Sequence, residues 1–534
     1  MEGKRRRKKK RHSKVLRAAG LCINALQVVA SAVLLILMMQ LNVLPVRYTG
    51  AVIGLTIFLA ILMILMQFPR KTRLAGCILS GIFCLVFILG DIYLARTHMV
   101  LSDITVEDNN YKVDQIVIAV LKDDPAEELE DTLIYNFGIQ KTLDRENTDT
   151  TISNIEEQSG TTLNVTEFDD LASMAQALYD GQVQAVIYNA AYDDTIEETV
   201  EDFTDQIKVL ENHEIRTQTQ MTGNDINVTQ NPFTVYISGI DVYGEISQTS
   251  RSDVNMLVTV NPQTKEVVMT TTPRDYYVQL PGVSGESRDK LTHAGIYGIQ
   301  CSIDTLEQLY DIEIDYYVRV NFTTLRNLVD ALGGVNVYSE YEFTTHYKNG
   351  GYEIKKGYNF MDGKKALAFA RERYNVPGGD EQRGRDQQAV LKALFEKVMS
   401  PSILTGYLGI LDSIEGNFET NMGMDQIASL VKMQLADGSS WDIKSQSVTG
   451  TFGNEYCYSG GYQLLSIMYP DETSVAEARQ GILRVLGLEE DAPEAVYAAE
   501  NILKNMASED QPGSAAAEAG ADGLDTALGI SGAW

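Results

Sequence analysis

Basic residues are scarce over most of this 534-residue chain. The whole chain has 44 Lys and Arg against 73 Asp and Glu, a formal net charge of −29. The first hundred residues contain 15 of the basic and only two of the acidic residues, so the remainder carries 29 basic against 71 acidic residues. Nucleic-acid binding needs a basic surface to meet the phosphates. The large acidic part of the chain is therefore not expected to bind nucleic acid.

Cysteine is also rare, with five residues in the chain. Cys22, Cys77 and Cys84 fall in apolar runs, where a free thiol behaves as a small apolar group. Cys301 and Cys457 lie outside these runs and could pair in a compartment that permits disulfides. The sequence does not fix their separation, so a disulfide and two free thiols both remain open.

Long apolar runs occur only in the N-terminal hundred residues. They are Ala18–Gln40, Thr49–Phe68 and Leu74–Ala95. Each has the roughly 20 residues that a helix needs to cross a bilayer. A secretory signal peptide has one short apolar core, so three runs argue against it. We predict three transmembrane helices within residues 18–96.

Two clusters of positive charge set the expected orientation of these helices. The N-terminal segment 1–17 contains the unbroken basic run Lys4–Arg11, and the segment 69–73 between the second and third runs contains three more cations. Basic residues flanking membrane spans remain in the cytoplasm. We therefore expect a multi-pass protein of the cell membrane, with a cytoplasmic N-terminus and extracytoplasmic domains after about residue 96.

Residues 105–225 alternate strand and helix patterns. Gln115–Val120 and Gln184–Tyr188 are typical of buried strands, whereas Phe168–Tyr179 and Ile196–Leu210 favour helices. The pattern predicts a small α/β domain, and it contains no catalytic motif. The polar stretch Gly223–Pro232 is expected to be a linker.

Residues 232–450 begin with three strand patterns, Thr234–Ile240, Val254–Val260 and Glu266–Thr272. An antiparallel meander of these strands would bring the end of the first, the start of the second and the end of the third to one edge of the sheet. The charged residues predicted to meet there are Asp241, Arg251, Asp253, Arg274 and Asp275. Carboxylates bind a hard cation such as Mg²⁺ and arginines bind phosphate oxygens, so this edge predicts a magnesium-phosphate site.

A cluster of arginines near residue 380 stands out in an acidic chain. Arg371 and Arg373 follow a helical segment that should end near Ala370, and Arg383 and Gln387 share one face of a second helix, from about 383 to 399. The paired donors of arginine suit phosphate or pyrophosphate, and the start of a helix favours an anion. Salt bridges to Glu372, Asp380 and Glu381 are an equally good explanation of the charge pattern alone.

Several motifs together resemble the LytR–CpsA–Psr family of bacterial cell-envelope proteins over about residues 232–402. They occur in the family's order: Ser250-Arg-Ser-Asp253, Thr272-Pro-Arg-Asp275, Lys290-Leu-Thr-His-Ala294, Asp315-Tyr-Tyr-Val-Arg-Val-Asn-Phe322, Gly333-Gly-Val-Asn336, Ala370-Arg-Glu-Arg373 and Asp380-Glu-Gln-Arg383. The three spans followed by an accessory domain resemble the capsule-type (CpsA-like) branch of Gram-positive bacteria. One departure is Asp386, which precedes Gln387 and Gln388.

The resemblance implies a fold and an activity. The expected architecture is three transmembrane helices, an α/β accessory domain (105–225) and an α-β-α catalytic domain (232–450) with a largely antiparallel sheet, then an extension (451–510) and a disordered tail (511–534). The implied activity is transfer of a capsule or teichoic-acid-like glycopolymer phosphate from a polyprenyl-pyrophosphate carrier to a sugar hydroxyl of peptidoglycan, with Mg²⁺ or Mn²⁺. Capsule-synthesis proteins are further candidate partners.

The resemblance also implies roles for individual residues. Asp241 and Asp253 would hold the metal, and Asp275 would accept the proton of the attacking hydroxyl beside Arg274. The residues implied to bind or support the pyrophosphate are Arg251, Arg274, Arg371, Arg373, Asp380, Arg383 and Gln387. For Lys290, a phosphate contact and a carboxylate partner are both open.

Two further points stay open at this stage. Tyr316, Val318, Leu325, Leu328, Val329 and Leu332 either line a slot for the lipid or belong to an ordinary core. The same site would also suit a pyrophosphate hydrolase, and a non-enzymatic scaffold of polysaccharide synthesis is the alternative from another functional class.

Overall fold

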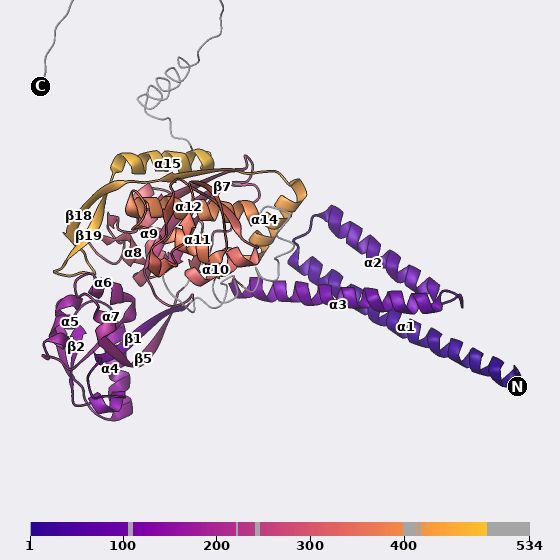
Figure 1. Cartoon of the computed structure of the whole chain (residues 1–534), viewed down its shortest axis with the longest axis horizontal. Coiled ribbons are helices and arrows are strands. Elements are labelled where there is room, and N and C mark those ends of the chain that lie inside the picture. Colours follow the sequence, from indigo (N-terminus) through magenta and orange to yellow (C-terminus); the bar gives the residue numbers. More distant parts are fainter. Residues whose placement is uncertain are drawn as a thin grey trace, which may run out of the picture. The chain divides into compact units, whose positions relative to one another are not determined.

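The computed structural model describes residues 2–104, 111–219, 223–240, 246–398, 413 and 418–488. Its elements fall into an N-terminal group of three long helices and two α/β units (Figure 1). We call residues 111–219 the accessory unit and residues 223–488 the main unit. The predicted metal ligand Asp241, the end of the predicted extension after residue 488 and the predicted tail 511–534 lie outside the described residues.

The N-terminal helices are α1 (Glu2–Leu41), α2 (Val46–Met66) and α3 (Arg73–Ile104). Their apolar segments of 25, 21 and 30 residues are long enough to cross a membrane. Ser80 on α3 donates a 2.6 Å hydrogen bond to Asn24 on α1, a polar contact of the kind that joins helices in an apolar solvent. The three predicted apolar helices are confirmed, and their orientation stays a prediction.

The accessory unit is a five-stranded sheet in the order β3-β2-β4-β1-β5. Its strands are β1 (Tyr111–Leu121), β2 (Asn136–Gln140), β3 (Asn164–Phe168), β4 (Ala185–Asn189) and β5 (Ile207–Gln218). Its helices are α4 (Arg145–Ser159), α5 (Leu171–Tyr179), α6 (Asp193–Glu197) and α7 (Phe203–Gln206). The strands predicted at 115–120 and 184–188 are confirmed as β1 and β4.

The helix predicted over Ile196–Leu210 is wrong. The chain forms the short helices α6 and α7, separated by Asp202 in the left-handed conformation, and then enters β5. Strand β5 pairs with β1 along its whole length in antiparallel register. Because this pairing satisfies the backbone groups of a long edge strand, a tertiary contact overrides the local helical preference.

The main unit contains a six-stranded sheet in the order β16-β11-β6-β7-β8-β17. The predicted meander is confirmed as β6 (Phe233–Ile240), β7 (Ser252–Asn261) and β8 (Glu266–Thr272), with antiparallel pairing throughout. Strands β11 (Tyr316–Asn321) and β17 (Asp442–Ser447) join its two sides in parallel, and β16 (Phe418–Thr420) pairs antiparallel with β11. The sheet is therefore largely antiparallel with two parallel pairs.

Helices cover both faces of this sheet. Leu257 and Val268 point to one face, where they pack with residues of α9 (Ile299–Tyr310) and α15 (Glu472–Leu486). Their neighbours Met256 and Met269 point to the other, against Leu391 of α12 (Gly379–Val398) and Ile427 of α14 (Met424–Asp437). Alternate side chains of each central strand thus enter two cores, which confirms the α-β-α layering.

The core continues past the boundary predicted at residue 450. Strands β18 (Gly450–Tyr456) and β19 (Leu464–Pro470) form a hairpin, and helix α15 follows. Met468 and Ile482 share a buried cluster with Tyr236 and Leu257 of the central sheet. The segment predicted as an extension is therefore part of the main unit through Gly487, because it covers one face of the sheet.

The remaining elements of the main unit are short. They are α8 (Leu291–Ala294), α10 (Phe322–Ala331), α11 (Gly363–Ala370), β9 (Tyr277–Val278), β10 (Asp289–Lys290), β12 (Val335–Ser339), β13 (Phe343–Thr344), β14 (Glu353–Ile354) and β15 (Gly357–Met361). Helix α11 is capped by Asp362 and ends at Ala370 as predicted. Helix α12 begins at Gly379, four residues before its predicted start.

The possible disulfide between Cys301 and Cys457 is not formed. Both residues are buried free thiols. Cys301 is on the buried face of α9, and Cys457 packs with Leu465 and Ile467 of the β18–β19 hairpin. Burial raises the pKa of the Cys301 thiol to about 12, so this side chain acts as a small apolar group.

Candidate functional site

The edge of the meander brings Asp253 and Arg274 together. Asp253 lies near the start of β7, and Arg274 follows the end of β8. Arg274 Nη1 donates a 2.9 Å hydrogen bond to Asp253 Oδ1, and Thr292 Oγ1 donates to the same oxygen at 3.3 Å. The meander therefore places the carboxylate and the guanidinium in contact although 21 residues separate them.

Arginines from three segments act on Asp253. Burial by itself would raise the pKa of this carboxyl, but the charges of Arg274, Arg251 and Arg383 hold it well below its usual range. Arg383 belongs to α12, more than a hundred residues after Asp253. The carboxylate–arginine edge and the later arginine cluster thus lie close enough to interact electrostatically.

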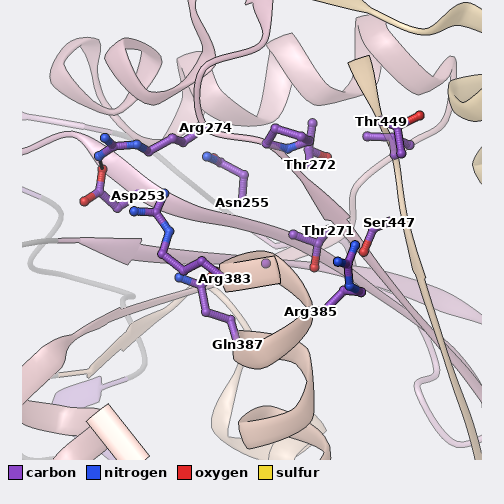
Figure 2. A pocket seen from close by; sticks show the side chains of 13 residues that line it. Asp253, Asn255, Thr271, Thr272, Arg274, Arg383, Arg385, Gln387, Ser447 and Thr449 are labelled. Atoms are coloured by element: carbon purple, nitrogen blue, oxygen red, sulfur yellow. Dashed lines mark hydrogen bonds and ion pairs between the residues drawn. The ribbon is translucent and has the colours of Figure 1, made fainter. Parts of the chain in front are cut away.

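A pocket lies where these segments meet (Figure 2). Strand β7 supplies Asp253 and Asn255, and the end of β8 supplies the segment Thr271–Arg274. Helix α12 supplies Arg383 and Gln387, which lie on one face as predicted, together with Gly384 and Arg385. Ser447, Val448 and Thr449, at and just after the end of β17, complete the lining.

The sequence did not point to several of these lining residues. Asn255, Thr271, Ser447 and Thr449 are small polar residues without a motif of their own, and Ser447 reaches the pocket only because β17 joins β8 in parallel. At Gly384 a Cβ would lie 3.2 Å from the Thr271 side chain, so glycine permits the close approach of α12 to the sheet.

Arg371 and Arg373 do not belong to the lining of this pocket. The Arg371 guanidinium lies 4.4 Å from the centre of the Phe322 ring, and the exposed Arg373 donates to the Tyr374 hydroxyl at 2.7 Å. Between them, the fully buried Glu372 accepts backbone N–H bonds from Tyr374 and Asn375. The Glu372 carboxylate therefore binds backbone N–H groups of the loop. The prediction had paired it with arginine side chains.

Asp386, where the motif departs from the family pattern, is a buried carboxyl on α12. Burial raises its pKa to about 7, partly offset by a 2.9 Å hydrogen bond from Gln382 Nε2. Its Oδ2 atom has no hydrogen-bond partner among the described residues. Arg385 bonds to Gln382 Oε1 at 2.6 and 3.0 Å, so Gln382 connects Asp386 to an arginine of the pocket.

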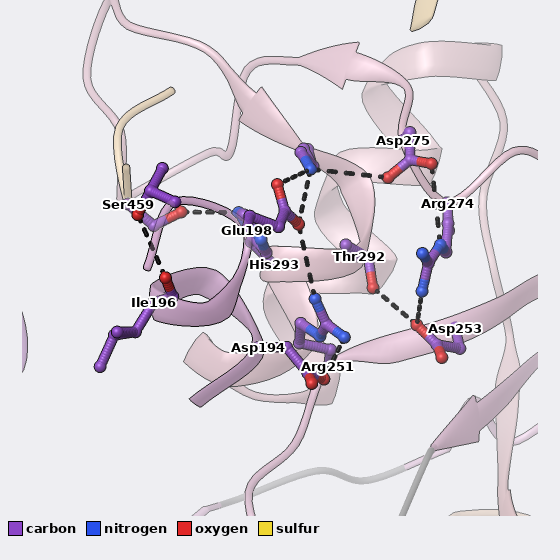
Figure 3. A network of polar contacts seen from close by, with 12 residues as sticks. Asp194, Ile196, Glu198, Arg251, Asp253, Arg274, Asp275, Thr292, His293 and Ser459 are labelled. Carbon is purple, nitrogen blue, oxygen red and sulfur yellow. Dashed lines mark hydrogen bonds and ion pairs between the residues drawn. The ribbon is translucent and has the colours of Figure 1, made fainter. Parts of the chain in front are cut away.

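Arg251, Lys290 and Asp275 form a network beside the pocket (Figure 3). Arg251 pairs with Asp194 and lies 3.8 Å from Glu198, and Lys290 bonds to Glu198. Of the two readings left open for Lys290, the structure therefore shows the carboxylate partner. Asp275 lies 3.9 Å from Lys290 and 3.7 Å from Arg274.

Of the other predicted residues, those that the structure describes lie outside the lining of the pocket. Asp380 lies in the first turn of α12, and its side chain is outside the described part. Of the candidate lipid-slot residues, Tyr316 on β11 packs in the core on the α12 and α14 face of the sheet, and Val329 and Leu332 are in the cluster between α10, α11 and α12. No group of three or more His, Cys, Asp and Glu side chains suited to a metal occurs among the described residues.

Two proteins of the same name are similar in sequence to part of this chain. A polyisoprenyl-teichoic acid–peptidoglycan teichoic acid transferase of Enterococcus faecalis is 34% identical over 202 residues, which is 37% of this chain and 64% of that protein. A protein of the same name from Bacillus cereus is 36% identical over 202 residues, with coverages of 38% and 64%. The matched region thus spans less than two thirds of each relative.

Solved structures of similar proteins cover about half of this chain. The crystal structure of B. subtilis TagV is 28% identical, with a TM-score of 0.41, and the match covers 49% of this chain and 99% of that one. The structure of TagT bound to LI-WTA is 27% identical, with a TM-score of 0.39 and coverages of 49% and 94%.

The model of the LytR_cpsA_psr family matches residues 198–478. The match begins at Glu198, the partner of Lys290, and ends in the middle of α15. This range contains the meander, the arginine cluster and the pocket between them. Because the match covers more than half of the sequence, the chain belongs to the LytR_cpsA_psr family.

Proposed function

We propose that this protein transfers a glycopolymer phosphate from a polyprenyl-pyrophosphate carrier to a sugar hydroxyl of peptidoglycan, with Mg²⁺ or Mn²⁺. The observation that carries the proposal is the convergence of Arg274, Arg383 and Asp253 at one pocket in an otherwise acidic protein. Relatives over part of the chain are named as transferases that join polyisoprenyl-linked teichoic acid to peptidoglycan.

The arginines suit the charge of a pyrophosphate. Arg274 lines the pocket from the segment after β8, and Arg383 lines it from α12. Arg385 extends the cationic lining along α12. Phosphoryl transfer depends mainly on positioning and on neutralising the charge of the phosphoryl oxygens. In this role Arg383 and Gln387 would hold the pyrophosphate from the helix, and Arg274 would hold it from the sheet.

The proposed reaction is an in-line displacement at one phosphorus atom. The acceptor hydroxyl oxygen forms a bond to the phosphorus that carries the glycan, and the bond from that phosphorus to the bridging oxygen breaks. Polyprenyl phosphate leaves with the bridging oxygen. Asp275 is the candidate to receive the hydroxyl proton, because it is a carboxylate next to Arg274 at the edge of the pocket.

The metal would bind at Asp253. Magnesium commonly uses one or two protein carboxylates and completes its shell with substrate phosphates and water. Asp253 fits this use because its low pKa keeps the carboxylate ionised. Asp241 remains the predicted second ligand, and the metal when bound would neutralise charge on the phosphoryl oxygens.

The proposed location is the outer surface of the cell membrane. The three apolar helices would anchor the protein, and the basic N-terminus favours a cytoplasmic end and an external main unit. A polyprenyl carrier is itself held in the membrane, so such an anchor keeps donor and site together. A capsule polymer and a teichoic-acid-like polymer both have the required phosphate chemistry, and capsule-synthesis proteins remain candidate partners.

The test is to supply the full chain with a lipid-pyrophosphate glycan, Mg²⁺ and peptidoglycan. Covalent attachment of glycan to peptidoglycan supports transfer. Release of phosphate or free glycan without attachment supports a hydrolase, and no turnover supports the scaffold alternative.

Variants of the arginine loop sharpen this test. Arg371→Ala and Arg373→Ala should each lower turnover by roughly 10²–10³-fold if they meet the substrate, the usual effect of removing a preorganised charge donor. Arg216→Ala, at an exposed arginine of the accessory unit, is the control. Near-normal turnover in both loop variants would contradict their assignment to the site.

A further inference from the structure

Two carboxylates of the accessory unit reach the predicted cations of the main unit (Figure 3). Asp194 lies on α6, and Glu198 is the residue that ends this helix. Asp194 accepts a hydrogen bond from Arg251, and both oxygens of Glu198 accept from Lys290 Nζ, at 2.8 and 2.6 Å. The sequence contains no motif that would have indicated these contacts.

Lys290 depends on this partner because it is buried. The residue is only 2% exposed, so its ammonium group does not meet solvent. A buried charge is tolerated only with a paired counter-charge and hydrogen bonds. Asp275, at 3.9 Å, is too far for a direct hydrogen bond, so Glu198 is the close partner of the lysine.

The accessory unit is fixed at this place by backbone and apolar contacts. Val113 of β1 donates an N–H bond to Ser247 at 3.1 Å, and its carbonyl accepts from Thr249 at 2.8 Å, just before Arg251. Ile296, which follows α8, is buried in the hydrophobic cluster of the accessory unit. These contacts lie just before Arg251 and just after Lys290 in the chain. They therefore fix the position of Glu198 relative to both cations.

The charges continue from Glu198 into the pocket in alternating sign. Lys290 lies between Glu198 and Asp275, and Asp275 lies between Lys290 and Arg274. Arg274 in turn bonds to Asp253. A change of charge at Glu198 therefore alters the partners available to Asp275, the candidate proton acceptor.

We propose that Glu198 is a positioning residue for phosphotransfer, through which the accessory unit completes the site. Its carboxylate neutralises and holds Lys290, and with Asp194 it holds Arg251. Asp275 is then left to face Arg274 and the pocket instead of becoming the main counter-ion of Lys290. This inference rests on the proposed function, because it assigns a role in that same reaction.

The opposite possibility is that Glu198 occupies the place of a substrate phosphate and inhibits the protein. A phosphate could reach the buried Lys290 only in the place of the Glu198 carboxylate, and the Val113 hydrogen bonds and the buried Ile296 hold the unit that carries Glu198 in its position. The structure therefore favours a permanent positioning contact, and the two roles predict opposite changes in rate.

The experiment compares the full chain with Glu198→Gln, Glu198→Asp and the exposed control Glu201→Gln in the transfer reaction. Glu198→Gln should lower kcat roughly 10–100-fold with little change in KM, the usual effect of losing a group that orients the reacting residues. Glu198→Asp, which keeps the carboxylate, should restore part of the rate. Glu201→Gln should match the wild type.

The split between kcat and KM separates positioning from a purely structural role. With Glu198→Gln, the Lys290 charge draws Asp275 away from Arg274 and the pocket, so kcat should fall while KM changes little. A purely structural role would lower the amount of folded protein and leave kcat per folded molecule unchanged. If Glu198→Gln is unstable, Glu198→Leu with Lys290→Met removes both charges of the pair. That double variant should fold and still turn over slowly, because Asp275 has lost its lysine neighbour.

The outcomes distinguish this inference from the proposed function. A wild-type chain without transfer or hydrolysis would overturn the proposed function and, with it, this role. An active wild type with unchanged kcat in Glu198→Gln would overturn the positioning role alone. A faster Glu198→Gln variant would overturn it in favour of inhibition.

Discussion

The accessory unit and the main unit both bury carboxylates at the end of a sheet, but they stabilise them differently. In the accessory unit Asn189 donates to Asp114 at 3.1 Å and to Asp144 at 2.7 Å, and Asn147 also donates to both carboxylates. Lys112 lies 3.2 Å from Asp114. In the main unit the partners of Asp253 are arginines.

The difference has an electrostatic consequence. Burial raises the pKa of Asp144 to about 6 despite the amide bonds, whereas the arginines lower the pKa of Asp253. Amide donors satisfy hydrogen bonds without adding charge, but arginines add positive charge beyond what one carboxylate uses. Two α/β units of one chain thus have polar sites of different charge, and the arginine-rich one is suited to an anionic substrate.

The largest expected effect is on turnover at the arginine-rich site. Arg383→Ala should lower kcat by roughly 10³-fold, because it removes a preorganised cation from the pocket lining. Asp144→Asn, in the accessory cluster, should leave the transfer rate unchanged. A rate assay on both variants checks this, and equal losses would show that the two clusters do not differ in function.

The second effect is on the free energy of unfolding. Glu198→Gln leaves the buried Lys290 without its close partner and should destabilise the protein by about 3 kcal/mol, as expected for a broken buried ion pair. Lys112→Met should cost about 1 kcal/mol or less, because the lysine side chain is 22% exposed and two amides still serve Asp114. Denaturant unfolding of both variants measures the difference, and similar losses would contradict the contrast in burial.

The smallest effect is a difference in pH dependence. Because the pKa of Asp144 is raised, its contribution to stability is present below about pH 4 and declines as the pH rises through 6. The pKa of Asp253 is lowered, so its contribution is present above about pH 4 and is lost as the pH falls.

Asp144→Asn should therefore remove about 2 kcal/mol of the stability change between pH 4 and pH 8. Hydrogen exchange of the β1 and β4 amides at both pH values measures it locally. Amides of β7 in the same experiment serve as the internal reference, because the contribution of Asp253 is already present above about pH 4 and should change little over this range. An equal loss of stability in both units from pH 4 to pH 8 would refute the electrostatic comparison.

Features with a strong local pattern were predictable from sequence. The three apolar runs exceed the length of a bilayer span, and each is a helix. The strands β6, β7 and β8 alternate between two buried faces, and Asp362 marks the start of α11. In these segments the side-chain period and the capping residue act within a few positions of each other.

Features that depend on long-range pairing were not predictable. The segment 207–210 is a strand because it pairs with β1. Residues 451–487 belong to the main unit because their apolar side chains pack on one face of the sheet. Cys301 and Cys457 face separate apolar clusters, which no spacing rule reveals. Ser447 and Thr449 join the pocket only through the parallel pairing of β17 with β8.

The sequence by itself determined the three apolar helices, the meander and the presence of a carboxylate–arginine edge, because each follows from the order of residues over one or two neighbouring elements. Only the tertiary structure decided which cations lie in the pocket and which are paired elsewhere. Arg383 lies near Asp253 because α12 packs on the sheet, whereas Lys290 bonds to Glu198 because the accessory unit docks on the loop before β7. A charge finds its partner by proximity in space, and that proximity is set by the packing of elements far apart in the chain.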